Sequence, residues 1–278
     1  MSNAERLAGK RVLVTGAGNG LGSGIALQCA REGAAIAVHY SSSSAGASKI
    51  VAEIRAAGGK AAAFAADLGD LDEVARLAES ACQFLGGLDV LVNNAGITFN
   101  VPFAKVTPEQ FDQLYRVNVR GGFFLIQAVL QQLETSQGAV VNITSIHALE
   151  GMPEHSIYAG TKGAIVAYTR SLAIELGGLG VRVNAIAPGC VPVANYGQAL
   201  GDYDIEEMGR NIPAGYVGTP ADIGKAVVFL ASEDGRFMLG QTLVLDGGTT
   251  SWMPFNDQFR QSLSEQGIQF GKGYVPGL

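Results

Sequence analysis

Two residues that lie one helical turn apart could together move a proton. Residues 157–162 read IYAGTK, which places the phenol of Tyr158 four positions before the ammonium of Lys162. Residues four apart lie on the same face of a helix, so the two side chains would be neighbours. A cation beside a phenol favours the phenolate, and Tyr158 would then exchange a proton near neutral pH. A half-buried tyrosine beside a solvated lysine has the same spacing, so the pair alone leaves both interpretations open.

A glycine-rich loop follows the first expected strand. Residues 15–22 read TGAGNGLG, which fits T-G-x-x-x-G-x-G and does not fit G-x-G-x-x-G. A turn without Cβ atoms lets a pyrophosphate approach the positive end of the following helix. The alternative is a flexible turn that binds no ligand. The candidate cofactor-binding residues of this loop are Gly16, Asn19, Gly20, Leu21 and Gly22.

The end of the second expected strand bears on the choice of cofactor. An acid at this position would bind the ribose of NAD, but Tyr40 stands there and is followed by four serines. With no carboxylate to repel it, a 2′-phosphate could be held by Ser41, Ser42 and the N–H groups of the next helix start. The sequence therefore favours NADP, with NAD as the alternative. Helix capping alone would also account for the serines.

Short strands alternate with longer helices along the chain. The expected strands are nearly apolar, as parallel strands covered on both faces are, and span 11–15, 35–39, 60–65, 88–93, 138–144, 181–187 and 241–246. The expected helices span 20–32, 45–57, 71–85, 108–134, 157–178 and 220–232. Two of them begin with capping signals, Asp70 with Glu73 and Thr107 with Pro108. This alternation predicts an α/β fold, a Rossmann-like doubly wound parallel seven-stranded sheet with helices on both faces.

Two segments fall outside this alternation. No change in composition divides residues 1–248, which are expected to form a single domain. Within it, residues 189–218 form an insertion where a substrate-side lid would lie. Residues 249–278 are a C-terminal extension with more aromatic residues than a disordered tail would hold, so it is expected to dock on the domain or on a neighbouring subunit. Its aromatic residues are Trp252, Phe255, Phe259, Phe270 and Tyr274.

Composition narrows the class of protein. Hydrophobic residues make up 47% of the 278 residues, which is enough for a sizeable core, and the net charge of −6 without a basic run argues against a nucleic-acid partner. The apolar run GGFFLIQAVL is too short to span a membrane, and the first residues lack a signal-peptide pattern. Three Cys and three His are scattered without metal-ligand spacing, so no metal site is predicted. We therefore expect a cytoplasmic protein that acts on a small molecule.

Further motifs follow one another in a characteristic order. Residues 93–96 read NNAG after the fourth expected strand, Asn118 lies in the next helix, and Ser145 ends the fifth strand ahead of Tyr158 and Lys162. With the glycine loop, this ordered set resembles the short-chain dehydrogenase/reductase family over about residues 8–248. The resemblance favours the catalytic interpretation of Tyr158 over the structural one.

The resemblance implies an NAD(P)-dependent oxidoreductase that transfers a hydride between the cofactor and a carbonyl or secondary alcohol. Tyr158 would be the acid/base, Lys162 would bind the nicotinamide ribose, and Ser145 would hydrogen-bond the substrate oxygen. Asn118 would hold a water of a proton relay behind Lys162. Further residues that would line the cofactor are Asp67, Leu68, Asn94, Ala95, Gly96, Pro188, Gly189 and Val191. For the Asn and Gly residues a purely structural role is the alternative.

One position departs from the family pattern. The Thr usually found four residues after the Gly of the nicotinamide-side loop is Val193 here. A hydrogen bond to the carboxamide or phosphate would then be missing, with Asn195 or Tyr196 as a substitute.

The sequence leaves the substrate open. His147, Asn195 and Tyr196 would join Ser145 and Tyr158 around it, with His155 as a further contact. Sugar dehydrogenases of the family also carry a His after the catalytic Ser, so the alternative to a carbonyl reductase is a sugar or polyol dehydrogenase. An alternative of another class is a non-catalytic NAD(P)-binding sensor, which would not need the catalytic set. The resemblance also implies a homotetramer, a dimer of dimers, with helices 108–134 and 157–178 paired across a two-fold axis.

Overall fold

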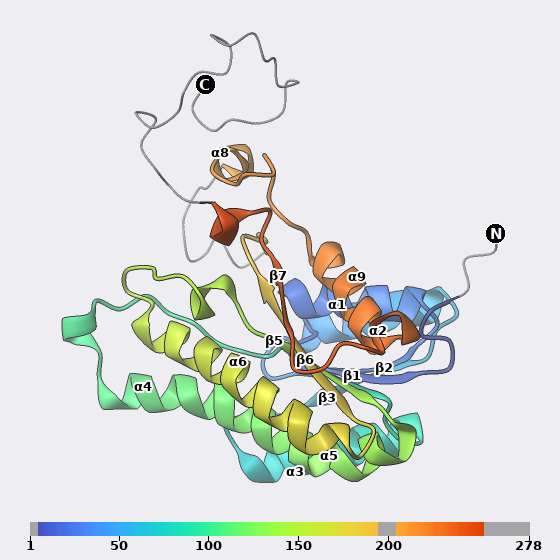
Figure 1. The fold of residues 1–278 in the computed structure, drawn as a ribbon. Coiled ribbons are helices and arrows are strands. Elements are labelled where there is room, and N and C mark those ends of the chain that lie inside the picture. Colours follow the sequence, from blue (N-terminus) through green and yellow to red (C-terminus); the bar gives the residue numbers. More distant parts are fainter. Residues whose placement is uncertain (1–4, 194–203, 253–278) are drawn as a thin grey trace, which may run out of the picture.

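Seven parallel strands form one sheet at the centre of the protein (Figure 1). The computed structural model describes residues 5–193 and 204–252. The strand order is β3-β2-β1-β4-β5-β6-β7. The strands are β1 (Arg11–Val14), β2 (Ala35–Tyr40), β3 (Ala61–Ala65), β4 (Val90–Asn93), β5 (Ala139–Ile143), β6 (Arg182–Pro188) and β7 (Thr242–Leu245). The predicted doubly wound sheet is confirmed, and each strand lies within two residues of its expected bounds.

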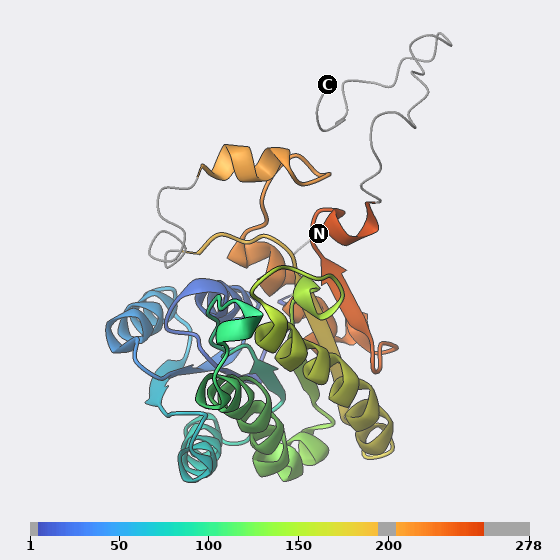
Figure 2. The same ribbon diagram turned by 90° about the vertical axis from the view of Figure 1, so that its left-hand side faces the viewer.

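Helices cover both faces of the sheet (Figures 1 and 2). One layer contains α1 (Gly20–Arg31), α2 (Ser44–Ala56) and α9 (Pro220–Ala231), and the other contains α3 (Leu71–Leu85), α5 (Gly122–Ser136) and α6 (Ser156–Gly177). Successive side chains of a strand point to opposite faces, so Val12 and Val14 pack under the first layer and Leu13 under the second. Because both faces are buried, the strands have to be apolar throughout.

The expected helix 108–134 is not one regular α-helix. It consists of α4 (Pro108–Tyr115), a wide π-helical turn η2 (Arg116–Gly121) and α5. An added Cβ at Gly121 would collide with the carbonyl oxygen of Leu68, so the backbone of the turn lies directly against the loop after β3. Turns of this kind occur often at functional sites.

The capping signals are confirmed with one difference. Thr107 and Gln110 form a complete capping box ahead of α4, with Pro108 in the first turn. Asp70 accepts hydrogen bonds from the backbone N–H groups at the start of α3, but the Glu73 carboxylate accepts from the N–H of Asp67 instead of returning to Asp70.

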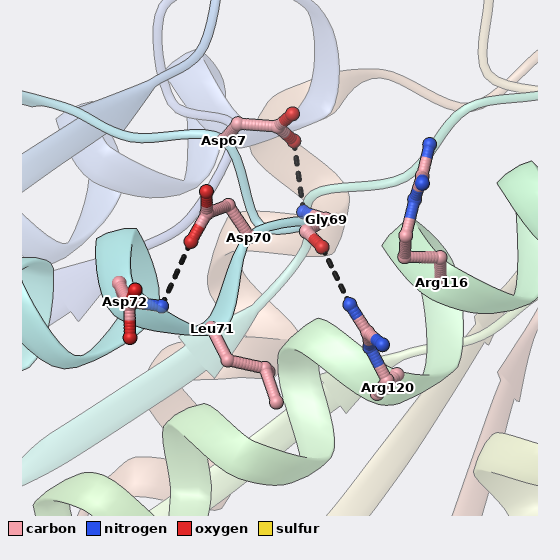
Figure 3. Close-up of a pocket in the computed structure, with 7 residues that line it drawn as sticks. All are labelled: Asp67, Gly69, Asp70, Leu71, Asp72, Arg116 and Arg120. Atoms are coloured by element: carbon pink, nitrogen blue, oxygen red, sulfur yellow. Dashed lines mark hydrogen bonds between the residues drawn. The ribbon is translucent and has the colours of Figure 1, made fainter.

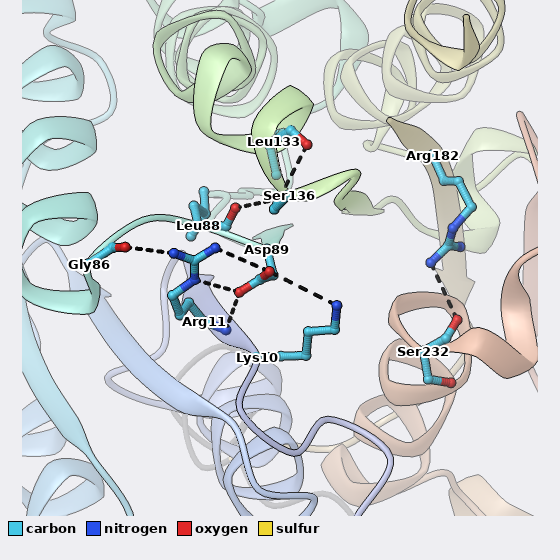
Figure 4. A network of polar contacts seen from close by, with 9 residues as sticks. All are labelled: Lys10, Arg11, Gly86, Leu88, Asp89, Leu133, Ser136, Arg182 and Ser232. Atoms are coloured by element: carbon cyan, nitrogen blue, oxygen red, sulfur yellow. Dashed lines mark hydrogen bonds and ion pairs between the residues drawn. The ribbon is translucent and has the colours of Figure 1, made fainter. Parts of the chain in front are cut away.

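A charged network fastens the amino ends of the strands (Figure 4). Arg11 donates through Nε to Asp89, at 2.7 Å, and through Nη1 to the carbonyl of Gly86. Arg182, at the start of β6, donates to backbone carbonyls around the end of α9, including that of Ser232. These charged side chains are bonded to one another or to nearby backbone groups, so the amino ends of the strands have a structural role.

The topological switch point lies at the other end of the strands, where their carboxyl ends meet. β1 lies between β2 and β4, so the connections that leave β1 and β4 turn to opposite sides and open a crevice at their carboxyl ends. The glycine loop follows β1 and the NNAG segment follows β4, which brings these two motifs to the same crevice. Within the described residues, no helix combines the length and apolar character needed to cross a membrane.

Candidate active site

The glycine loop has a backbone shape that only glycine adopts readily. Gly16 and Gly20 have φ angles of +63° and +55°, which favour glycine. A Cβ at Gly22 would collide with the carbonyl oxygen of Gly16, so the first turn of α1 lies tightly against the loop. Asn19 caps α1 without a side-chain hydrogen bond, which leaves the N–H groups at this helix start to an anion.

The NNAG segment holds the glycine loop from the β4 side. The Thr15 hydroxyl accepts from the N–H groups of Asn94 and Ala95, each at 2.9 Å, and donates to the carbonyl of Val92. The Asn94 side chain donates to the carbonyls of Thr15 and Gly16, at 2.9 and 3.3 Å. Asn94 and Ala95 therefore shape the loop through hydrogen bonds, which supports the structural alternative for these residues.

The segment after β2 meets the glycine loop at its other side. Asn19 Nδ2 donates to the Ser43 hydroxyl at 2.9 Å, whereas Ser41 and Ser42 are exposed. An added Cβ at Gly18 would lie 2.9 Å from Ser43 Cβ, so the two loops are in close contact. Residues 40–44 contain no carboxylate. Ser43 was not among the predicted cofactor residues, because the helix was expected to begin at residue 45 and begins at Ser44.

The residues after β3 form the rim of an open hollow (Figure 3). Asp67 is exposed and accepts from the N–H of Gly69 at 2.8 Å, while the Leu68 side chain is buried in the core. Arg120 donates to the carbonyl of Gly69 at 2.7 Å. The hollow measures about 450 Å³ and is lined by Asp67, Gly69, Asp70, Leu71, Asp72, Arg116 and Arg120. None of the expected catalytic residues lines it, so it is a hollow beside the cofactor crevice and not the reaction site.

Tyr158 and Lys162 lie on successive turns at the start of α6, on the same face. Lys162 Nζ lies 5.5 Å from the centroid of the Tyr158 ring. The lysine is 4% exposed, and its Nζ donates to the carbonyl of Ile143 at 3.0 Å. Burial lowers the pKa of Lys162 to about 8. The interpretation as a solvated lysine is therefore wrong.

Asn118 lies in the π-helical turn behind this pair. Its Oδ1 accepts from the N–H of Ile97 at 2.8 Å, and its Nδ2 donates to the carbonyl of Ile97 and to the Thr161 hydroxyl. A Cβ at Gly96 would lie 3.3 Å from Asn118 Oδ1 and 3.6 Å from Lys162 Nζ. The absence of a side chain at Gly96 lets the turn after β4 pass close to both residues.

Ser145 begins the short 3₁₀ helix η3 (Ile146–Ala148) after β5. Its hydroxyl accepts from the N–H of His147 at 3.2 Å, and the residue is buried. The neighbouring Thr144 donates its hydroxyl hydrogen bond to the carbonyl of Lys162 at 2.8 Å. This bond ties the end of β5 to α6 and so fixes Ser145 relative to Lys162.

Two histidine rings flank the ring of Tyr158. The centroids of His147 and His155 are 4.9 Å apart, and each lies 6.0 Å from the Tyr158 centroid in an edge-to-face arrangement. Burial, and secondly the field of His155, lower the pKa of His147. His147 and His155, the latter three residues before Tyr158, therefore form an aromatic cluster with the Tyr158 ring.

The loop after β6 passes over the glycine loop. Gly189 donates its N–H to the carbonyl of Leu245, and a Cβ there would lie 2.6 Å from Asp246 Cα, so glycine is needed beside β7. Val191 is buried in the core. A Cβ at Gly20 would lie 3.5 Å from Val193, which places an apolar side chain where the family has its Thr.

Parts of the predicted site lie outside the described residues. These are Asn195 and Tyr196, with the rest of residues 194–203, and the extension from 253 onward. The described part of the expected lid contains the short helix α8 (Ile205–Arg210), which stands apart from the two helical layers (Figure 2).

Comparisons with known proteins agree with one another. A family model described as enoyl-(acyl carrier protein) reductase matches residues 16–250. Versicolorin reductase 1 of Dothistroma septosporum is 37% identical over 254 residues, which cover 87% of this chain and 97% of the relative. Hydroxynaphthalene reductase-like protein Arp2 of Metarhizium anisopliae is 38% identical over 258 residues, covering 88% and 96%.

Solved structures give the same picture. A short chain dehydrogenase from Burkholderia cenocepacia in complex with NADP is 34% identical, with a TM-score of 0.82 and coverage of 88% of this chain and 99% of that one. A dehydrogenase/reductase from Sinorhizobium meliloti is 36% identical, with a TM-score of 0.83 and coverage of 88% and 97%.

Proposed function

The chain belongs to the short-chain dehydrogenase/reductase family, and we propose that it is an NADP-dependent reductase of ketones attached to aromatic ring systems. The observation that carries this proposal is the pairing of Tyr158 with a buried Lys162 next to the turn after β4. This pair and the glycine loop belong to one crevice, so a bound nicotinamide and a proton donor would meet there.

The residues of the crevice fit NADP. The uncapped start of α1 would receive the pyrophosphate, and the glycines leave the space for it. The 2′-phosphate would be held by Ser41, Ser42 and Ser43, because residues 40–44 carry no competing carboxylate. One solved relative is a complex with NADP. The bound cofactor supplies the hydride, and the chain supplies position, proton and electrostatics.

Ser145 and Tyr158 would act on the carbonyl oxygen of the substrate. The Ser145 hydroxyl already accepts from His147 N–H, and its own proton has no acceptor among the described residues, so it can donate to the substrate. Tyr158 would give its phenolic proton to the same oxygen as negative charge develops there. Two donors aimed at one oxygen lower the barrier to reduction.

Lys162 would stabilise the phenolate that remains. Its Nζ lies 5.5 Å from the ring centroid, so its positive charge would favour the phenolate over the neutral phenol. Its pKa of about 8 keeps most of the ammonium protonated at pH 7. The Asn118 amide is already bonded to Ile97 and Thr161, so the expected relay water would be held by backbone carbonyls of the wide turn.

The walls beside Tyr158 favour a flat, aromatic substrate. The His147 and His155 rings pack against the Tyr158 ring, and Leu149 and Met152, in the segment between the two histidines, are 47% and 49% exposed. Ring-bearing walls select aromatic ligands through stacking and edge contacts. The relatives named above are reductases, and one name includes hydroxynaphthalene. The sugar dehydrogenase and the non-catalytic sensor are accordingly not favoured.

The test follows nicotinamide absorbance with NADPH and NADH against hydroxylated tetralones, aliphatic keto esters and, with NADP⁺, aldoses. We expect NADPH-dependent reduction of the tetralones. Tyr158→Phe should remove turnover and leave NADPH affinity within about twofold. Turnover of aldoses alone, or cofactor binding without turnover on the whole panel, would reject the proposal.

The proposal extends to assembly. Exposed apolar side chains on the α4–α6 side, Phe111, Phe124 and Ile174, support pairing of these helices in a homotetramer, a dimer of dimers. Residues 1–248 would act as one cytoplasmic domain with 189–218 as its lid, and the extension would dock on the domain or on a neighbouring subunit. Phe124→Asp should reduce the mass measured by sedimentation. Truncation after Gly248 that leaves mass and substrate preference unchanged would exclude a role for the extension.

A further inference from the structure

His39, at the end of β2, is a buried histidine outside the catalytic set. It is 1% exposed, and both ring nitrogens are within hydrogen-bond distance of backbone groups. Nδ1 lies 3.0 Å from the backbone nitrogen of Gly16 in the glycine loop, and Nε2 lies 3.0 Å from the carbonyl oxygen of Ala66, directly after β3. The ring therefore bridges the loop after β1 to the loop after β3.

The partners of the ring determine its protonation state. The Gly16 N–H can only donate, so Nδ1 has to accept, and the Ala66 carbonyl can only accept, so Nε2 has to carry the proton. This is the neutral Nε2–H tautomer. An imidazolium would turn a second N–H against that of Gly16, and the bridge would be lost.

The charges around the ring agree with the neutral form. Burial lowers the pKa of His39, against the opposing effects of the Ala66 carbonyl and the Asp67 carboxylate. Further acidic groups lie at the start of α3, where Glu73 accepts from Asp67 N–H and Asp72 is exposed. On the β1 side the ring meets the neutral glycine loop. Burial thus outweighs the nearby negative charges.

His39 holds the glycine loop twice. Its ring accepts from Gly16 N–H, and its own carbonyl accepts from Ala17 N–H at 2.7 Å. Asn94 holds the carbonyls of the same loop from the β4 side. Without the ring, the N–H of Gly16, a residue at positive φ, would lack its buried acceptor. The loop would then lose part of its β2-side support.

We propose that His39 is a positioning residue for the cofactor. Its neutral ring orders the glycine loop before a dinucleotide arrives, and so removes an ordering cost from cofactor binding. The inference rests on the proposed NADP-dependent function. It assigns His39 no contact with the substrate, so the substrate side of the reaction should not depend on it.

Two substitutions test whether the hydrogen-bond acceptor at the Nδ1 position, and not the ring as such, is what matters. In His39→Asn the amide oxygen can take the place of Nδ1, whereas in His39→Gln the amide reaches toward the position of Nε2 and leaves Gly16 N–H without its acceptor. We expect NADPH affinity, measured by fluorescence titration at pH 7.5, to stay within about threefold for His39→Asn and to weaken about tenfold for His39→Gln. For both, kcat at saturating NADPH and the KM for substrate should stay near wild type. Thermal unfolding checks that both variants are folded.

Equal affinities for the two variants would overturn the proposal, because then the acceptor at Nδ1 does not matter. Loss of kcat rather than cofactor affinity would also overturn it. Histidine-selective ¹⁵N NMR gives a readout independent of the cofactor. The chain has only three histidines, so the His39 signal is identified by its loss in His39→Asn. An Nε2–H form at pH 7.5 is expected, and an Nδ1–H or doubly protonated ring would reject the bridge. Failure of wild-type protein to bind NADPH, together with an Nε2–H ring, would reject the proposed function and leave the bridge intact.

Discussion

Replacing Lys162 by Met should inactivate the enzyme and at the same time stabilise the cofactor-free protein. In the proposed reaction the ammonium would stabilise the Tyr158 phenolate. Lys162 is only 4% exposed, however, and among the described residues its Nζ has one hydrogen-bond partner, the carbonyl of Ile143. Burial of a charge without a counter-ion is costly, and an apolar side chain of similar length removes that cost.

The magnitude follows from the pKa. A fall from 10.5 to about 8 corresponds to about 3 kcal/mol of free energy that folding costs the protonated Lys162 at pH 7. Lys162→Met would remove this cost but would also lose the hydrogen bond to Ile143, which lowers stability by about 1–2 kcal/mol. Lys162→Met should therefore raise the free energy of unfolding by roughly 1–2 kcal/mol at pH 7.

The pH dependence identifies the cause. Between pH 8 and 10.5 the unfolded chain binds the proton that folded Lys162 has lost, so the contribution of Lys162 to stability rises with pH. The difference in unfolding free energy in favour of Lys162→Met should then shrink between about pH 8 and 10.5 and change sign. Buried Cys29 and Tyr168, whose pKa values burial raises, act equally in both proteins and cancel in the difference.

Urea unfolding without cofactor, at equal protein concentration and at several pH values, measures this difference. Lys49→Met is the matched control, because Lys49 is exposed and its replacement should give a small effect that does not change with pH. A destabilised Lys162→Met protein with a constant difference across the pH range would refute the reasoning. It would mean that the folded protein stabilises the ammonium instead of penalising it.

Three further predictions address the cofactor crevice. Val193→Thr places a hydroxyl over Gly20, where a Cβ would lie 3.5 Å from Val193, and should tighten NADPH binding about two- to fivefold in a titration; no change would show that the hydroxyl finds no partner. Tyr40→Asp supplies the missing acid and should shift the ratio of kcat/KM from NADPH toward NADH at least tenfold; an unchanged ratio would place the 2′-phosphate elsewhere. Because burial lowers the pKa of His39, the unfolded state binds more protons than the folded state below pH 6.5. The stability of wild type should therefore fall more on acidification than that of His39→Asn. Urea midpoints that fall equally with pH in the two proteins would contradict this.

The sequence predicted the sheet well because parallel strands covered on both faces are apolar along their whole length. The π-helical turn was not predictable in this way. One extra residue in a turn leaves the apolar pattern of 108–134 almost unchanged. The contact that accompanies it, the close approach of Gly121 to the carbonyl of Leu68, joins segments far apart in the sequence. The spacing of Tyr158 and Lys162 was equally visible, but the burial of Lys162 depends on the end of β5, which only the fold brings there.

The hydrogen bonds of Asn94 and His39 show why the sequence left the role of Asn94 open and gave no role to His39. Each side chain bonds the backbone of the glycine loop from a strand distant in sequence, so spacing contains no trace of the contact. From the sequence, an asparagine after a strand could contact either a ligand or the backbone, and a lone histidine belongs to none of the recognised motifs. Only the positions of their donors and acceptors distinguish these possibilities.

The crevice contains two kinds of polar side chain, those that bond the loops and those proposed to act on the substrate. The side chains of Asn94, His39 and Asn118 bond backbone groups at the ends of β1, β3 and β4, and Asn118 also bonds the Thr161 hydroxyl. These bonds would preorganise the loops before any ligand binds. Substitutions among these residues should act mainly on cofactor affinity and stability. In the proposed reaction Tyr158 and Ser145 would instead act on the substrate oxygen, and their substitution should lower kcat. Lys162 donates to the Ile143 carbonyl and would also act on Tyr158, so it belongs to both groups. Its replacement should therefore raise stability and lower activity.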